Sequence, residues 1–419
     1  MPKRRVVVTG LGLVTSIGNS KNTVISNLKR LNCNFKLANN VNRVIGIVKS
    51  YNLSSLDTKD WVYPKKYKLK PDVLKSLAPQ GLYCYCSTID ALSDAGMDIK
   101  ILNSPRVGLF TASAGSPRNL LYNLNRLINQ GVSKCSPFGM IISISGTLTF
   151  NLVSLFKVKG ASCCFVSACS SSGHALGYAY NEIVDGSQDI MLVVSGEDGD
   201  LETILPFAGM RALSTNPDPG LASKPFDRKR NGFVGSGGGV TLILESLYFA
   251  KKRKAFIYSE FIGWSKTSDG FHKVAPEPNG EGLYRCITSA LKNSNTTVGD
   301  ISYINAHATS TSVGDLAEIK ALRKLLRFVP KKQNKLYISS TKGLTGHCLS
   351  MASVLETCIC MLSIRYGFIV GAANISNLDK NALNLNIIRK SLTCSVSTVI
   401  NTSSGFGGSN TCLVFKKLQ

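Results

Sequence analysis

The sequence has few acidic residues. Its 419 residues contain 25 Asp and Glu against 49 Lys and Arg, so the formal net charge is +24. An excess of this size first suggests nucleic acid or a membrane surface as a partner. The basic clusters are short, however, and the densest runs only from Lys65 to Lys70. No zinc-finger spacing, aromatic-rich RNA signature or basic heptad region accompanies them, so nucleic-acid binding is disfavoured as the main function.

Other signals that are missing narrow the class further. No run of about 18 uncharged apolar residues occurs, so no membrane span is predicted. The segment after Lys3–Arg5 lacks the apolar core of a secretion signal. The thirteen cysteines form no CxxC pair and no metal-ligand spacing, which favours free thiols in a reducing, cytoplasmic compartment and predicts no metal site. Gly10 and Gly12 lack the third glycine of a dinucleotide fingerprint, so no cofactor is expected.

What is present is an apolar, glycine-rich chain in which short β-rich runs alternate with helical patterns. This alternation predicts an α/β fold with mostly buried sheets. Strands are expected at Val6–Thr9, Arg106–Ala112, Met191–Ser195, Val240–Glu245, Ala255–Trp264, Ser302–Asn305, Tyr337–Ser340, Val396–Asn401 and Thr411–Lys416. Helices are expected at Leu82–Gly96, Ser171–Asp185, Gly282–Asn293, Val313–Leu326 and Met351–Tyr366.

The two halves of the chain have a similar layout. Each opens with a basic, β-branched strand and closes with a glycine-rich turn before a final strand, at Gly235–Gly239 and at Gly405–Gly408. No flexible linker or low-complexity segment separates them. We therefore predict a structural duplication, with one half over residues 1–250 and the other over 251–419.

Cys169 is the strongest candidate for a catalytic residue. Small residues surround it in Ser167-Ala168-Cys169-Ser170-Ser171, and a helical pattern follows. A cysteine at a strand-to-helix turn lies over the positive end of the helix dipole, which lowers the thiol pKa and favours the nucleophilic thiolate. The alternative is a buried structural cysteine, an interpretation that fits most of the other twelve.

Two of the four histidines strengthen the catalytic interpretation. His307 and His347 each lie in a turn rich in hydroxyl groups or glycine, after a predicted strand and before a predicted helix. Such strand ends often carry the functional groups of α/β proteins. His174 and His272 lack these surroundings and are interpreted as structural.

Taken with these residues, the sequence resembles the β-ketoacyl-acyl-carrier-protein synthases, condensing enzymes of the thiolase fold. The resemblance spans the chain from Val8–Gly12 to Gly405–Asn410, and the set of Cys169, two histidines and a lysine five residues before His347 carries it. Gly115–Arg118 and Arg228–Gly239 resemble the type I elongating branch. The resemblance implies two duplicated βαβαβαββ halves in a five-layer α-β-α-β-α arrangement.

The resemblance also implies a reaction. Cys169 would take an acyl chain from a carrier thioester, and carrier-bound malonate would lose carbon dioxide and attack it in a Claisen condensation, giving 3-oxoacyl-acyl carrier protein for fatty-acid elongation. Neutral His307 and His347 would donate hydrogen bonds to the enolate. Lys342 would pair with Glu318 and so remain charged in the site.

Further roles follow from the same resemblance. The backbone N–H groups of Cys169 and Phe406 would form an oxyanion hole, and the hydroxyls of Thr309 and Thr311 would bind the phosphopantetheine arm, which is part of the carrier and not a free cofactor. Two positions depart from the family pattern. Ala308 replaces a glycine, and Ser404 replaces an aromatic residue that, with Phe406, gates the nucleophile. We expect altered chain-length selection from Ser404.

The expected partners are acyl carrier protein and a second copy of the chain. Carrier proteins are acidic, so a basic patch would steer them. Lys75 and Lys134 fall near positions that the family uses, and further candidates are Lys65, Lys66, Lys68, Lys70 and Arg118. Two alternatives remain open: a ketosynthase of a polyketide or aryl-polyene pathway, and a non-catalytic subunit that sets chain length. Subunits of the last kind lose the cysteine, and this chain keeps it.

Overall fold

A computed structural model of the chain describes residues 3–38, 43–46, 66–67, 69–327 and 336–418. Ten strands form one sheet in the order β10-β9-β13-β14-β8-β1-β7-β6-β4-β5. The strands of the first half are β1 (Val6–Thr15), β4 (Val107–Ala112), β5 (Ser162–Phe165), β6 (Ile190–Glu197) and β7 (Gly238–Ser246). Those of the second half are β8 (Ser259–Ser268), β9 (Tyr303–Asn305), β10 (Tyr337–Ser339), β13 (Thr398–Gly405) and β14 (Ser409–Lys416).

The strand order confirms the duplication. The first half reads β5-β4-β6-β7-β1 and the second β10-β9-β13-β14-β8, which is the same order of successive strands. The main helices also correspond in chain order: α3 (Pro79–Asp94), α5 (Thr147–Phe156) and α6 (Ser171–Val184) match α10 (Glu281–Asn293), α11 (Ser312–Leu326) and α13 (Ala352–Tyr366). Each half is therefore βαβαβαββ. The predicted division at residue 250 falls inside α9 (Leu247–Lys252) and stays a prediction.

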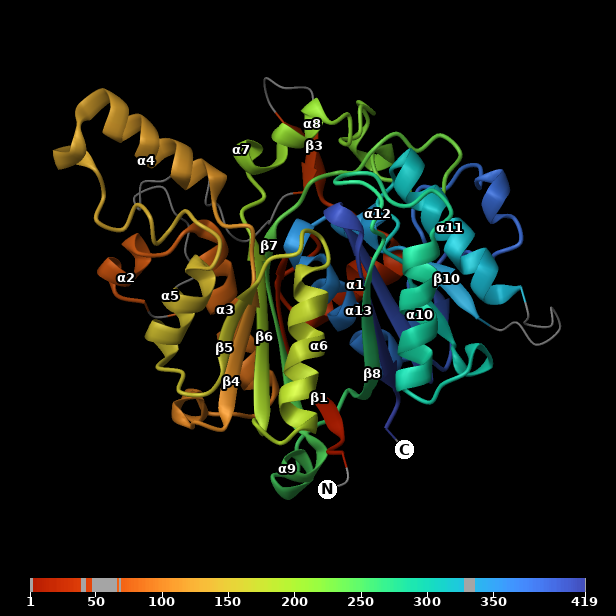
Figure 1. Ribbon diagram of the computed structural model, residues 1–419, viewed down its shortest axis with the longest axis horizontal. Helices are drawn as coiled ribbons and strands as arrows, with labels where there is room; N and C mark the ends of the chain where they lie inside the picture. The colour runs from red at the N-terminus through yellow and green to blue at the C-terminus, as the bar shows by residue number, and fades with distance from the viewer. Residues whose placement is uncertain (1–2, 39–42, 47–65, 68, 328–335, 419) are drawn as a thin grey trace.

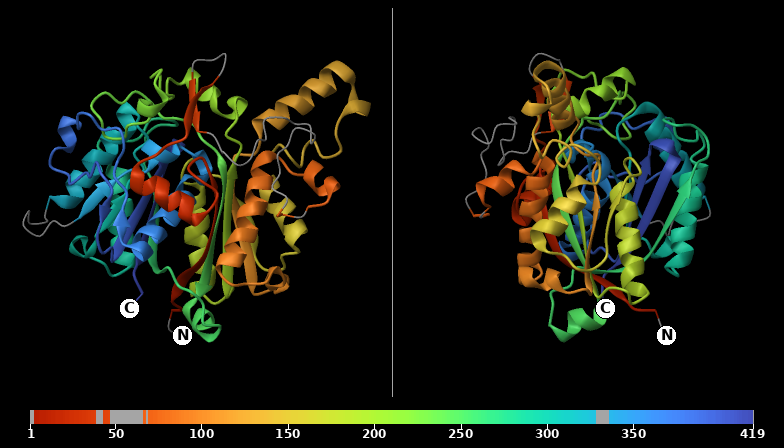
Figure 2. Two further views of the ribbon diagram at one scale, coloured as in Figure 1. Left: turned by 180° about the vertical axis from the view of Figure 1, so that it is seen from behind. Right: turned by 60° about the vertical axis from the view of Figure 1, so that its left-hand side comes forward.

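The halves meet where Val6–Val8 of β1 pairs antiparallel with β8. Between them, α6 and α13 share one apolar core with β1 and β14. Helices α3 and α5 build a second core on one outer side, and α10 and α11 a third on the other. Figures 1 and 2 show these outer helices on opposite sides of the molecule. The expected five-layer arrangement is thus confirmed.

Two glycines let α6 approach the second half of the sheet. A Cβ atom on Gly173 would lie 2.3 Å from Thr411 Oγ1, and one on Gly177 would lie 2.2 Å from the Trp264 ring. Any larger residue would push the helix off the strands. Because α6 begins directly after Cys169, this close packing fixes the nucleophile against the second half of the chain.

Every predicted strand and helix is present, often extended by a few residues, as in β1, which continues to Thr15. Several elements were not predicted; the longest are α4 (Pro117–Gln130), α1 (Lys21–Arg30) and α5, and β5 is also among them. One helical stretch, Leu349–Tyr366, is long and apolar enough to cross a membrane, with a mean hydropathy of 1.3. It is 89% buried inside the fold, which is the expected environment of a core helix.

Candidate active site

The turn that carries Cys169 is held in a left-handed conformation. Ala168 has φ of 51°, which is uncommon for a residue with a Cβ atom. Two serine hydroxyls stabilise it: Ser171 Oγ accepts from Ser167 N at 2.8 Å and donates to Ala168 O at 2.5 Å, and Ser170 Oγ donates to Ser167 O at 2.7 Å. The small polar run in the sequence therefore builds the turn that presents the sulfur.

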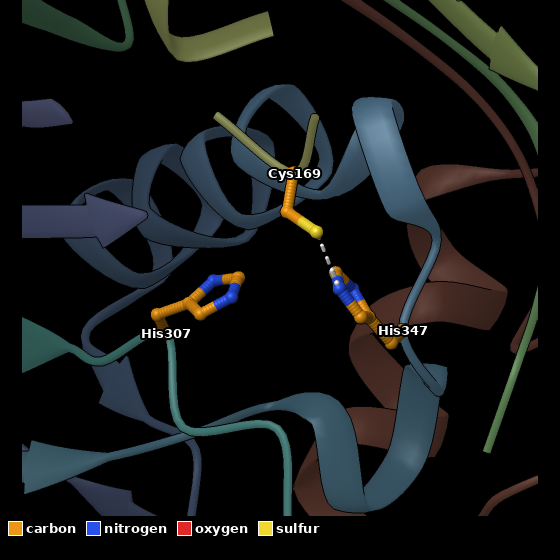
Figure 3. A group of neighbouring side chains, drawn as sticks. All are labelled: Cys169, His307 and His347. Atoms are coloured by element: carbon orange, nitrogen blue, oxygen red, sulfur yellow. Dashed lines mark hydrogen bonds between the residues drawn. The ribbon is translucent and has the colours of Figure 1, made fainter. Parts of the chain in front are cut away.

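The two histidines approach Cys169 from separate segments of the second half. His307 follows β9, and His347 follows α12 (Lys342–Thr345). His347 Nε2 lies 3.0 Å from Cys169 Sγ, and the centroids of the two imidazole rings are 5.3 Å apart at an interplanar angle of 84°. Figure 3 shows all three side chains pointing into one space. The structure thus brings the predicted Cys-His-His set together.

The electrostatics of Cys169 differ from the prediction. Burial raises the pKa of its thiol to about 12, and the positive charge of Lys342 opposes this only in part. The expectation of a lowered thiol pKa from the helix dipole is therefore wrong. The thiol is protonated at neutral pH, so it needs a base to become a nucleophile. His347 Nε2 is within hydrogen-bonding distance to accept that proton.

Both imidazoles are neutral at physiological pH. Burial lowers the pKa of His307 and His347 well below the ordinary value, and the nearby Lys342 ammonium lowers both further. Water has little access to Nδ1 of either histidine, because both atoms are buried. A neutral imidazole both donates and accepts a hydrogen bond, which an imidazolium does not.

Glu318 does not form the predicted ion pair with Lys342. Its carboxylate accepts from the backbone N–H groups of His307, at 2.9 Å, and of Ala308, at 2.6 Å, and from the hydroxyl of Thr402, at 2.9 Å. These bonds fix the turn that carries His307. The methyl group of Ala308 does not prevent them.

Glu356 is the partner of Lys342 instead. Both side chains are about 1% exposed, and the Lys342 Nζ donates to Glu356 Oε1. Sequence reasoning missed Glu356, although a signal was present: it is the only acidic residue in the apolar stretch Leu349–Tyr366. A carboxylate in a buried helix needs a cation or several hydrogen-bond donors, so such a residue points to a buried partner.

A second buried acid, Glu197 at the end of β6, was also missed. It accepts from Ala114 N at 3.0 Å and from the Ser350 hydroxyl, and its Oε2 has no partner among the described residues. Burial raises the pKa of its carboxyl to about 7. Glu197 also contributes to the raised pKa of the Cys169 thiol.

A cavity of about 350 Å³ is lined by Cys169, His307 and His347. Thr309 and Thr311 both line it, with their hydroxyl oxygens 3.0 Å apart. Ser404 and Phe406 line it as well, and the Ser404 hydroxyl donates to Asn410 Oδ1 at 2.7 Å. A Cβ atom on Gly405 would lie 3.0 Å from Cys169 N, so the end of β13 packs directly against the nucleophile turn.

The basic residues that were predicted to dock the carrier protein differ in their exposure. Lys66, Lys70, Lys75 and Lys134 are exposed, whereas Lys65 and Lys68 lie outside the described residues. Arg118 is an incorrect docking candidate: it is 6% exposed and pairs with Asp198 at 3.2 Å and with Asp200.

The remaining two histidines have local contacts that fit a structural role. His174 is partly buried, with Nδ1 2.9 Å from Ser167 Oγ. His272 is exposed, and its Nδ1 accepts from Val274 N at 3.1 Å and from Ala275 N at 3.0 Å. Among the cysteines, all thirteen are free thiols, as predicted.

Comparison with known proteins places this geometry in a family. Residues 3–250 match the N-terminal domain of β-ketoacyl synthases, and residues 258–376 match the C-terminal domain. The chain is 36% identical to 3-oxoacyl-[acyl-carrier-protein] synthase 1 of Buchnera aphidicola subsp. Acyrthosiphon pisum and 35% identical to the protein of that name from Escherichia coli K12, in both cases over 99% of this chain and 100% of the relative.

Solved structures give the same result. The chain superimposes with a TM-score of 0.87 and 25% identity, over the full length of both chains, on a structure described as a type II polyketide synthase acyl-carrier protein in complex with its ketosynthase bound to the hexaketide. The fold is therefore that of the thiolase-like ketosynthases. With both domains matched in order over nearly the whole chain, the protein belongs to the β-ketoacyl synthase family.

Proposed function

We propose that this chain catalyses the decarboxylative Claisen condensation of malonyl-acyl carrier protein with an acyl chain on Cys169, giving 3-oxoacyl-acyl carrier protein in fatty-acid elongation. The observation that carries the proposal is the 3.0 Å contact of Cys169 Sγ with His347 Nε2, with His307 opposite and one cavity open to all three. The full-length similarity to enzymes named 3-oxoacyl-[acyl-carrier-protein] synthase gives the substrate class.

In the first half-reaction, the acyl chain moves from the carrier to the enzyme. His347 Nε2 accepts the thiol proton as Sγ attacks the thioester carbonyl, and it returns that proton to the carrier thiolate as the thiolate leaves. The backbone N–H groups of Cys169 and Phe406 stabilise the oxyanion. Their placement is supported by the contact of the Gly405 position with Cys169 N.

In the second half-reaction, carrier-bound malonate loses carbon dioxide and its thioester oxygen becomes an enolate. Neutral His307 and His347 donate hydrogen bonds to that oxygen, each worth about 3–4 kcal/mol of transition-state stabilisation. For His347 this step uses the tautomer with the proton on Nε2, whereas acyl transfer uses the tautomer with the proton on Nδ1. The enolate carbon then attacks the acyl-cysteine, the new carbon–carbon bond forms, and the Cys169 thiolate leaves. The lowered pKa of both histidines keeps these donors uncharged.

The charged residues position these groups. Lys342, held by Glu356, keeps the imidazoles neutral through its own positive charge. The Glu318 carboxylate fixes the position of His307 by accepting hydrogen bonds from the backbone N–H groups of His307 and Ala308. Thr309 and Thr311 bind the phosphopantetheine arm from the cavity wall. No separate cofactor is needed, because the thioester carries the reacting group.

Ser404 and Phe406 gate the nucleophile, and Ser404 gives a wider opening than an aromatic residue would. The Ser404→Phe variant should restrict the range of acyl chains accepted without loss of malonyl decarboxylation, because the reacting groups remain. Chain-length profiles of the wild type and the variant test this role, and identical profiles would refute it.

The functional unit is a homodimer. Strand β5 is the last strand of the sheet, and one of its edges pairs with no other described strand. Cys163 on this strand is exposed, and the nearby Val166 is 62% exposed. An apolar open edge is an association site. Sedimentation should give twice the chain mass for the wild type and a monomer for Val166→Glu.

Acyl carrier protein docks at Lys75 and Lys134, both of which are exposed. Helix α2 (Pro71–Lys75) and α4 lie at the opposite end of the long axis from α11, which lines the cavity (Figure 1). In a dimer, these lysines therefore serve the cavity of the partner chain. Charge reversal at either position should raise the KM for carrier-bound malonate and leave kcat unchanged. We place the enzyme in the cytoplasm, where its free thiols stay reduced.

The decisive experiment is a condensation assay with acyl- and malonyl-carrier protein, run beside Cys169→Ala. A 3-oxoacyl product from the wild type alone supports the proposal, and no product from the wild type refutes it. A polyketide ketosynthase is the second candidate, favoured by structural neighbours such as the hexaketide complex. Its 25% identity is below the 35–36% shared with the named fatty-acid enzymes, so fatty-acid elongation is preferred.

A further inference from the structure

The three reactive side chains have the geometry of a chelating site for a soft metal ion. One ligand atom from each of Cys169, His307 and His347 lies within 4.8 Å of the other two. They come from three separate segments and converge on one point (Figure 3). No spacing along the sequence reveals this set, because the three ligands are brought together only by the packing of the two halves.

The distances suit zinc. In a tetrahedral site, Zn–S is about 2.3 Å and Zn–N about 2.0–2.1 Å, so neighbouring sulfur and nitrogen ligands are about 3.5 Å apart. The present separation of Cys169 Sγ and His347 Nε2 is 3.0 Å. Small side-chain rotations reach the tetrahedral spacing. One thiolate and two imidazoles form a donor set typical of Zn²⁺, and the cavity leaves the fourth position open.

The surrounding charges permit a divalent cation. The Lys342 ammonium lowers the pKa of both histidines and so opposes a bound cation, but its pairing with Glu356 offsets this charge in part. Buried carboxyl groups also lie close by: Glu197 contributes to the raised pKa of the Cys169 thiol, and Glu318 accepts from the backbone N–H of His307. Both histidine Nδ1 atoms, however, lack a hydrogen-bond partner among the described residues. Partners of that kind strengthen zinc sites by about 10–100-fold. The ion is therefore bound less tightly than in a structural zinc site and exchanges with solution.

We propose that Cys169, His307 and His347 bind Zn²⁺ in the acyl-free enzyme and that the bound ion inhibits acyl transfer. On binding, the thiol proton passes to solvent, a Zn–S bond forms, and each imidazole coordinates through Nε2 with its proton on Nδ1. No group is oxidised or reduced. An acyl chain on Cys169 removes the thiolate ligand, so the acyl-enzyme is protected. The inhibition rests on the proposed condensing activity, whereas the binding does not.

Metal binding is tested first without substrate. The full-length protein is titrated with Co²⁺, whose thiolate complexes absorb in the near ultraviolet, and Zn²⁺ is then used to displace it. We expect one equivalent of Co²⁺ with a thiolate absorption band in the wild type, and binding more than about 100-fold weaker in Cys169→Ser and in His307→Ala. The matched control is Cys394→Ala, which removes a partly exposed free cysteine outside β5 and should bind as the wild type does.

The outcomes separate the two proposals. Binding that is unchanged in Cys169→Ser, or lost in Cys394→Ala, overturns the metal site, and so does one bound equivalent without the thiolate band. Circular dichroism spectra of the variants, matched to the wild type, exclude unfolding as the cause. In the condensation assay, Zn²⁺ should inhibit reversibly with a chelator, and prior acylation of Cys169 should protect. A protein that binds Co²⁺ through Cys169 but forms no 3-oxoacyl product refutes the proposed function alone.

Discussion

The two halves of the molecule share one topology but hold their reactive groups differently. In the first half, the hydroxyls of Ser170 and Ser171 stabilise the turn before α6, and the reactive group is a neutral thiol. In the second half, the buried Glu318 carboxylate holds the turn of His307, and the buried Lys342–Glu356 pair places a positive charge near both histidines. The duplication therefore supplies two equivalent positions, and the residues at the turns divide the chemistry between them.

The largest expected effects separate acyl transfer from decarboxylation. Cys169→Ala should lower condensation by about 10⁴-fold or more, because the covalent intermediate is lost, and should keep malonyl decarboxylation within about tenfold. His307→Ala should do the reverse, with decarboxylation reduced by about 10²–10³-fold and acylation of Cys169 retained. Carbon dioxide release and mass spectrometry of the intact protein measure the two steps.

The opposite pattern would show that acyl transfer and decarboxylation do not depend on separate residues. If Cys169→Ala abolished decarboxylation, or if His307→Ala prevented acylation, the two halves would act as a single unit in both steps. Because His347 contacts the sulfur and also faces His307, His347→Ala should impair both reactions, and it serves as the reference for a shared role.

The next largest effect concerns the buried ion pair. Glu356→Gln leaves the Lys342 ammonium, about 1% exposed, without its charged partner, and should lower the free energy of unfolding by about 3–5 kcal/mol. The matched variant in the first half, Ser170→Ala, removes neutral hydrogen bonds to Ser167 O and Ser409 Oγ and should cost about 1–2 kcal/mol. Urea denaturation measures both. Equal costs would mean that the halves are held by interactions of the same strength.

The sequence predicts most of this fold because its strands are short apolar runs bounded by glycines. The eight residues of β6 are all buried, which is the pattern such a run predicts. Helix α4 is not predicted, although Ser116 followed by Pro117 is a pattern typical of a helix start. In the site, Cys169, His307 and His347 stand out by residue type and surroundings. The Glu356 partner of Lys342 does not, since their pairing is decided by packing across 14 residues of sequence.

A smaller effect tests the buried carboxyl between the halves. The folded pKa of Glu197 is about 7 against 4.5 for an ordinary glutamate, so its proton is kept on folding. A raised carboxyl pKa gives stability that is lost as the pH rises from about 4.5 to 7, and the loss reaches about 3 kcal/mol. Glu197→Gln should therefore be more stable than the wild type at pH 8 and not at pH 4.5. Urea denaturation at both values measures this, and parallel pH profiles would contradict it.

The smallest effect on stability is expected at the strained turn of the first half. Ala168→Gly removes the cost of a left-handed alanine, about 1 kcal/mol, but raises the entropy of the unfolded chain by a similar amount, so stability should change by less than about 0.5 kcal/mol. Glycine also lets the turn sample other conformations, and kcat should fall several-fold with little change in KM. The control is Lys157→Gly, an exposed left-handed position with φ of 54° at the end of α5, where the same exchange should leave kcat unchanged. Equal kcat values in both variants would show that the conformation of Ala168 is a feature of folding rather than a means of aiming the Cys169 sulfur.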